Sequence, residues 1–137
     1  MTLEELKESI MKDLKMNMSE LAFECANNPL LYTKYVHLGG EIKLEIKRSE
    51  IKKKQVTTQR WLFYSGKGSG KVSPIIYSST DIKRVLESDD EIVAIDQRLI
   101  LLELKKEIID EAVKAFQQRG FSLKNIIDVK KFEQGGY

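Results

Sequence analysis

Residues 88–118, SDDEIVAIDQRLILLELKKEIIDEAVKAFQQ, decide the fold class of this chain. Apolar side chains recur there at alternating steps of three and four residues, and only Lys106 interrupts the pattern. This spacing is typical of a helix that packs against its neighbours along its whole length. The apolar seam consists of Ile92, Ile95, Leu99, Leu102, Ile109, Val113 and Phe116. Ile100, Leu101, Leu104 and Ile108 widen it, so a central bundle helix and a subunit interface both remain open.

The ends of this long helix are predicted from its capping residues. Ser88 is the expected N-cap, with Glu91 at the position that completes a capping box. Gly120 is expected to end the helix in a left-handed cap directly after Arg119. Ser122 would then cap a separate final helix near the end of the chain.

The N-terminal third of the chain predicts two helices. Thr2 and Glu5 have the spacing of a capping box, which indicates that a first helix begins directly after Thr2. A second helix is expected over residues 20–37. Pro29 lies inside it, and we expect a kink or a fresh start there because proline lacks the backbone N–H that a helix interior needs.

The middle of the chain predicts one long helix followed by a flexible loop. Gly39–Gly40 is expected to stop the second helix, and residues 41–64 then read as a helix of their own. Residues 65–80 are rich in Gly and Ser and indicate a loop, and a short helix over 81–87 follows. The predicted fold class is therefore all-α, a helical bundle of roughly six helices with a long central helix and no convincing sheet.

The C-terminal segment has an apolar surface that is a candidate contact between subunits. We divide the chain into a helical domain, residues 1–119, and a C-terminal helical segment, residues 120–137. A terminal helix with a broad apolar face must dock somewhere, and another subunit is one candidate. The residues expected to hold subunits together are Phe121, Leu123, Ile126, Ile127 and Phe132.

Composition argues against metal, membrane and catalytic functions. Cys25 and His37 are the single cysteine and the single histidine, too few to build a structural zinc site. No apolar run approaches the roughly 20 residues of a membrane span, and the N-terminus lacks the apolar core of a signal peptide. We therefore expect a cytoplasmic protein with no cofactor, no metal ligands and no catalytic residues.

The charge distribution is more informative than the net charge of +2. Residues 1–50 and 81–137 each carry a net charge of −2, whereas residues 51–80 carry +6 and contain no acidic residue. We call residues 51–80 the acid-free stretch. A local cationic zone of this kind attracts polyanions.

Aromatic residues are interleaved with the cations of the acid-free stretch. Cations contact phosphates and aromatic faces stack on unpaired bases, so the combination favours single-stranded over duplex nucleic acid. The alternative is a solvated lysine face beside core aromatics, in a helical scaffold or adaptor protein that binds no nucleic acid. The candidate binding residues are Lys52, Lys53, Lys54, Arg60, Trp61, Tyr64, Lys67 and Lys71.

A glycine-rich segment over residues 66–71, GKGSGK, resembles a phosphate-binding loop only superficially. That pattern requires four residues between its first Gly and the Gly-Lys pair, and here there are three. Val72 stands where a Ser or Thr would hold magnesium, and a helix rather than a strand is predicted before the loop. A nucleotide hydrolase is therefore the weaker alternative.

Three short stretches carry a resemblance to a known family along essentially the whole chain. They are ECANN at 24–28 with Leu31-Tyr32; Arg60 with YSGKG at 64–68; and RGF at 119–121 with Lys124, Ile126, Asp128, Phe132-Glu133 and Gly135. In order and spacing they resemble the UvsY family of phage recombination mediators.

The resemblance implies a non-enzymatic protein that loads a RecA-like recombinase of the UvsX type onto single-stranded DNA (ssDNA) covered by a single-strand-binding protein. It also implies a hexamer or heptamer ring held largely by the C-terminal region, in the cytoplasm of the infected bacterial host. By position, Arg60 matches the family's DNA-contacting arginine. The family's lysine two residues earlier is Thr58 here, and Lys52 to Lys54 or Lys71 are candidates to replace it.

Overall fold

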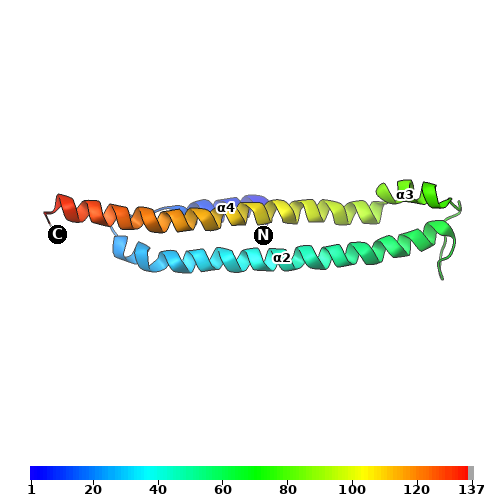
Figure 1. Cartoon of the computed structure of the whole chain (residues 1–137), viewed down its shortest axis with the longest axis horizontal. Coiled ribbons are helices and arrows are strands. Elements are labelled where there is room, and N and C mark those ends of the chain that lie inside the picture. Colours follow the sequence, from blue (N-terminus) through cyan, green and yellow to red (C-terminus); the bar gives the residue numbers. More distant parts are fainter. Residues whose placement is uncertain (136–137) are drawn as a thin grey trace. The chain divides into compact units, whose positions relative to one another are not determined.

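The computed structural model describes residues 1–135 and contains four helices and no strand within that range. Helix α1 spans Leu3–Leu14, α2 spans Leu21–Ser65, α3 spans Ser79–Glu87 and α4 spans Asp90–Glu133 (Figure 1). The predicted all-α class and the long helix are confirmed. The expected number of about six helices is wrong, because α2 and α4 each continue through the breaks that the sequence suggested.

The chain forms two compact units, and α2 and α4 contribute to both. We call residues 1–42 with 104–135 the terminal unit, and Lys43–Glu103 the central unit. Each is described by itself below.

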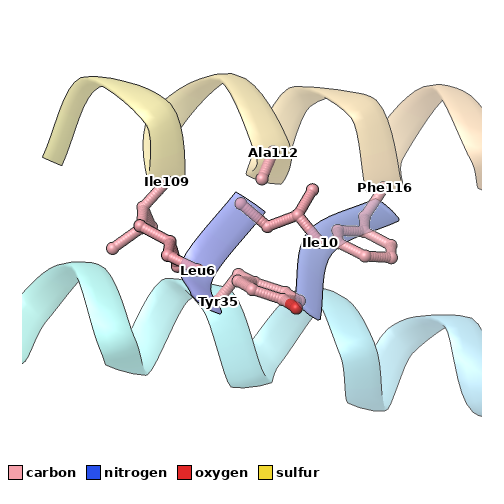
Figure 2. Close-up of a cluster of buried hydrophobic side chains, with 6 residues drawn as sticks. All are labelled: Leu6, Ile10, Tyr35, Ile109, Ala112 and Phe116. Atoms are coloured by element: carbon pink, nitrogen blue, oxygen red, sulfur yellow. The ribbon is translucent and has the colours of Figure 1, made fainter. Parts of the chain in front are cut away.

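The core of the terminal unit lies where α1 and segments of α2 and α4 meet (Figure 2). Tyr35 of α2 stacks on Phe116 of α4 with 5.1 Å between ring centroids, and both are fully buried. The Tyr35 hydroxyl donates to Asp13 of α1 at 2.7 Å, which satisfies the polar end of the ring. The predicted Thr2–Glu5 capping box is present at the start of α1. The cluster consists of Leu6, Ile10, Tyr35, Ile109, Ala112 and Phe116.

The expected helix break at Pro29 is wrong, and tertiary contacts on both sides of the proline explain why. Asn28 donates to the Phe116 carbonyl at 2.9 Å, and Tyr35 is held in the core. Residues on both sides of Pro29 are thus anchored to Phe116 of α4. Packing and hydrogen bonding therefore outweigh the roughly 3 kcal/mol that an interior proline costs a helix.

The glycines expected to end helices instead allow close approach between them. Gly39 is buried, and a Cβ atom built on it would lie 3.2 Å from Cγ2 of Ile109 in α4. A Cβ built on Gly120 would lie 3.2 Å from the side-chain amide nitrogen of Asn28. Neither glycine has a positive φ, so the predicted stop at 39–40 and the predicted left-handed cap at 120 are both wrong. Nothing in the structure explains Gly40, whose Cβ would meet open space.

In the central unit the two long helices run antiparallel. Glu45 and Lys53 of α2 pair with Arg98 and Asp96 of α4 at 3.6 and 2.8 Å. Arg60, closer to the end of α2, pairs with Asp89, the residue directly before α4. The buried apolar residues of this unit are Ile82, Ile92, Ile95 and Leu102. The last three belong to the predicted seam of the long helix.

Candidate nucleic-acid interface

Helix α2 ends in a Schellman motif that fixes the beginning of the following loop. The N–H of Gly66 donates to the Phe63 carbonyl at 3.3 Å, and the N–H of Lys67 donates to the Leu62 carbonyl at 3.0 Å. Gly66 has a φ of 73°, the left-handed conformation this motif requires and glycine adopts without strain. Further along, Ser73 and Tyr77 donate backbone hydrogen bonds to Phe63 and Tyr64. The predicted loop is present, and these hydrogen bonds tie it back to the last turn of α2.

Asp89 organises the polar cluster between the ends of α2 and α4. Its side chain is 2% exposed, and its Oδ2 accepts hydrogen bonds from Arg60 Nε at 2.8 Å and from the Tyr64 hydroxyl at 2.6 Å. Its Oδ1 accepts from the backbone N–H groups of Glu91 and Ile92 at 3.0 and 3.2 Å. Asp89 is thus the N-cap of α4, and the expected cap at Ser88 is wrong. One carboxylate oxygen of Asp89 caps the helix while the other binds Arg60 and Tyr64, and the single hydroxyl of a serine could not do both.

Ionisation in this cluster follows from its hydrogen bonds. Burial opposes the charged form of Asp89, but hydrogen bonds from Tyr64 and Arg60 outweigh burial and hold its pKa below the ordinary value. Burial, with the hydrogen bond to Asp89, raises the pKa of the Tyr64 hydroxyl. Hydrogen bonds to Tyr64 and Asp89 raise the pKa of Arg60 further above its ordinary value. The cluster therefore holds a permanent Arg60–Asp89 ion pair at neutral pH.

Arg60 is also stacked, and its surroundings are acidic. Its guanidinium lies 4.3 Å from the ring centroid of Phe63, and its side chain is 24% exposed. Asp90 and Glu91 line a polar depression of about 290 Å³ together with Arg60, and Glu91 Oε1 lies 3.9 Å from Arg60 Nη1. This depression therefore offers one cation beside three carboxylates, a weak attraction for phosphate.

The six predicted binding residues within α2 fall on three sides of the helix, and Lys52 is alone on one of them. Each residue advances about 100° around a helix, so Lys53, Arg60 and Tyr64 share the side that faces α4. Lys53 pairs there with Asp96 at 2.8 Å. Lys54 and Trp61 share a second side about 100° away, and the ammonium of Lys67 lies 5.4 Å from the Trp61 ring centroid.

Four of the predicted lysines remain open to solvent. Lys52, Lys54, Lys67 and Lys71 are exposed, and within residues 1–135 no salt bridge joins them to a carboxylate. The structure thus places Lys67 against Trp61 and Lys54 on the same side of α2, and it pairs Lys53 and Arg60 with Asp96 and Asp89. Lys52 and Lys71 form no salt bridge within the described residues.

The residues expected to join subunits differ widely in exposure. Phe121 and Phe132 are 65% and 68% exposed on α4, whereas Leu123 is 1% exposed and belongs to the interior of the terminal unit. Ile126 and Ile127 are half-buried, and Ile126 lines a shallow depression of about 360 Å³ with Met18 and Val129. The exposed apolar surface at this end of α4 therefore includes Phe121 and Val129 but not Leu123.

Sequence reasoning missed a buried ionic network in the terminal unit. Arg119 is 4% exposed, and its guanidinium donates to Glu24, to Asn28 and to the backbone carbonyls of Leu14 and Lys15. The signal was present, because Glu24, Asn28 and Arg119 all lie in stretches that carry the family resemblance. The stretches that contain Glu24, Asn28 and Arg119 contact each other in the folded chain. Two of the three stretches that carry the resemblance therefore have a structural role.

No group of three or more His, Cys, Asp or Glu side chains in residues 1–135 is arranged to hold a metal ion. None of the helices in the same range is long and apolar enough to cross a membrane.

Comparison with known proteins decides the family. The sequence profile of the family described as "Recombination, repair and ssDNA binding protein UvsY" matches residues 9–136. The chain is 35% identical over 136 residues to the "Recombination protein uvsY" of Enterobacteria phage T4, covering 98% of this chain and 99% of that protein. The chain belongs to the UvsY family.

Solved structures agree with this assignment. The chain matches two crystal structures of the bacteriophage T4 recombination mediator protein UvsY, each at 34% sequence identity. The lattice type II structure gives a TM-score of 0.85 with 98% of both chains covered, and the type IV structure gives 0.86 with 96% and 99% covered. This UvsY-family chain is therefore a recombination, repair and ssDNA-binding protein, which disfavours the alternative of a scaffold without nucleic-acid binding.

Proposed function

We propose that several copies of this UvsY-family chain assemble and bind one single strand of DNA together. We further propose that the assembly loads a RecA-like recombinase of the UvsX type onto ssDNA covered by a single-strand-binding protein, in the cytoplasm of the infected host. No catalytic step by the chain itself is part of this proposal. The T4 relatives are described as a recombination protein and a recombination mediator, which supports the role.

The observation that carries the proposal is the set of exposed lysines in the acid-free stretch. Lys52, Lys54, Lys67 and Lys71 offer up to four phosphate contacts per chain. For single strands the logarithm of affinity falls by about 0.7 per neutralised phosphate for each unit of log salt concentration, so four contacts give a slope of about −3 per chain. One chain binds weakly on these terms at physiological salt, and several copies on one strand would bind tightly through avidity.

A charge-matched comparison tests the DNA-binding part. Lys54→Gln with Lys71→Gln removes two exposed cations of the acid-free stretch, and Lys43→Gln with Lys47→Gln removes two exposed cations of α2 outside it. Titration of an ssDNA oligonucleotide at several salt concentrations should show the slope of the first variant reduced by about 1.4 per bound chain. The control variant should keep the original slope. Equal slopes in the two variants would contradict the proposal.

Assembly is tested at the exposed end of α4. A truncation after Gly120 would also delete Leu123 from the core, so substitutions at exposed positions are cleaner. Phe121→Ser with Val129→Ser should yield smaller species in sedimentation velocity and weaker ssDNA binding, because fewer sites then act on one strand. Phe23→Ser removes an aromatic of similar exposure on α2 and serves as the control. An unchanged sedimentation coefficient in the double variant would show that this surface does not join subunits.

A further inference from the structure

We infer that Trp61 is a stacking platform for one unpaired base of bound ssDNA, with Lys54 and Lys67 placed to contact the neighbouring phosphates. This inference rests on the proposed ssDNA binding and adds a component that reads the bases as well as the charge of the strand. It assigns different tasks to two sides of α2.

The first step is the position of Trp61 on the helix. Lys54, Thr58, Trp61 and Ser65 recur at steps of four, three and four residues, so they form one stripe along α2. The Thr58 hydroxyl donates to the Lys54 carbonyl at 3.1 Å, which keeps this short side chain against the helix. Lys54 and Trp61 are therefore two turns, or about 10 Å, apart along the stripe, with the short Thr58 side chain between them.

The second step is the charge around the stripe. Lys54 is exposed, and within residues 1–135 no salt bridge pairs it or Lys67 with a carboxylate. The carboxylates of Asp89 and Asp96 are engaged with Arg60 and Lys53, on the side of α2 that faces α4. The stripe is thus the side of this part of α2 where cations and an aromatic ring occur together without a paired acid.

The third step is the fixed position of Lys67. Its N–H and that of Gly68 both donate to the Leu62 carbonyl, at 3.0 and 3.2 Å, so the backbone at Lys67 is held close to the last turns of α2. From there its ammonium reaches the indole face at 5.4 Å from the centroid. Bound ssDNA therefore has to order little of the backbone at Lys67, and preorganisation of this kind favours binding.

The fourth step is competition for the indole face. A cation–π contact at a solvated site is weaker than the stacking of a base on an aromatic ring. An incoming base should therefore displace the Lys67 ammonium from the ring. The released ammonium remains within reach of the phosphate of the same nucleotide, where it forms a stronger, charge-paired contact.

Intrinsic fluorescence tests this inference in the full-length protein, because Trp61 is the single tryptophan of the chain. The probe is a single-stranded oligonucleotide, compared with one of equal length and charge that carries abasic sites. Stacking should quench the Trp61 emission with the first and leave it unchanged with the second. Trp61→Leu should weaken binding of the base-bearing strand about fivefold or more per site, while Trp61→Phe, which keeps a ring, should retain most of the affinity.

The outcomes separate this inference from the proposal beneath it. Salt-dependent binding of both oligonucleotides with equal affinity and no quenching would overturn the stacking role and leave the cationic mechanism standing. Quenching by the abasic strand as well would also overturn it, because emission would then report charge alone. Absence of any ssDNA binding would overturn the proposed function, and the stacking role with it. Circular dichroism of the two variants verifies that the helices remain formed.

Discussion

Replacement of Arg119 by methionine should destabilise the terminal unit more than any surface ion-pair change. Methionine approximates the length of the arginine stem but removes every donor of the guanidinium. Glu24, whose side chain is 9% exposed, would keep a buried charge without its counterion, and the carbonyls of Leu14 and Lys15 would lose their donor. Removal of one partner from a buried pair costs about 3–5 kcal/mol.

A double-mutant cycle measures how much of this cost comes from the stranded carboxylate. Glu24→Gln removes the charge and keeps a side chain that can still accept a hydrogen bond from the Asn17 N–H. The free energy of unfolding, measured by urea titration followed by circular dichroism, should fall less in the double variant than the sum of the two single losses. The difference should be about 1–3 kcal/mol, as expected for residues in one hydrogen-bonded network.

Arg98→Met in the central unit provides the control. Arg98 pairs with Glu45 at 3.6 Å, but the two side chains are 64% and 47% exposed. An exposed pair of this kind contributes about 0–1 kcal/mol. If Arg119→Met and Arg98→Met lowered stability equally, or if the double variant were strictly additive, the structural reading of the buried network would be refuted.

Three further predictions follow from single contacts. Gly39→Leu should lower the free energy of unfolding by about 1–3 kcal/mol in urea titrations, because the new side chain overpacks against Ile109. Gly40→Ala should raise the free energy of unfolding by about 0.5–1 kcal/mol. A Gly39→Leu variant of wild-type stability would disprove the close packing. Asp89 has a folded-state pKa below its ordinary value of 3.8, so the stability it contributes is complete above that value and is lost as pH falls through the folded pKa. In an acid titration, Asp89→Asn should therefore lose less stability than the wild type. Identical acid curves would count against the ion pair. Asp89→Ala should be less stable than Asp89→Asn by about 1 kcal/mol in thermal unfolding, because asparagine still caps α4, and equal stabilities would argue against that cap.

Local signals predicted those parts of the fold that depend on neighbouring residues. The Thr2–Glu5 capping box, the loop after residue 65 and the apolar seam from Ile92 onward require only short-range spacing, and the structure confirms them. Pro29 and Gly39 misled the analysis because their usual effect on a helix is an average over contexts. Here Phe116 and Ile109, about 70 to 90 residues away in sequence, supply contacts that override it.

The charges of the candidate site show the same limit of prediction from local sequence. The stretch from residue 51 to residue 80 contains no acid, yet Asp89 at the N-cap of α4 and Asp96 within α4 neutralise Arg60 and Lys53 in the folded chain. Linear counting could not predict this, because the pairing depends on which side of α2 faces α4. A helix advances about 100° per residue, so Lys53 meets an acid while Lys54 does not.

The folded arrangement makes each chain a weaker and more directional ligand for DNA than its sequence suggests. Two of the six cations that the stretch contributes are engaged internally, and the remaining lysines lie on different sides of α2 and its loop. A single phosphate backbone can follow only part of that surface on one chain. The proposed assembly would restore tight binding by presenting the same stripe of several copies to one strand, so the loss of Phe121 and Val129 on α4 should weaken DNA binding.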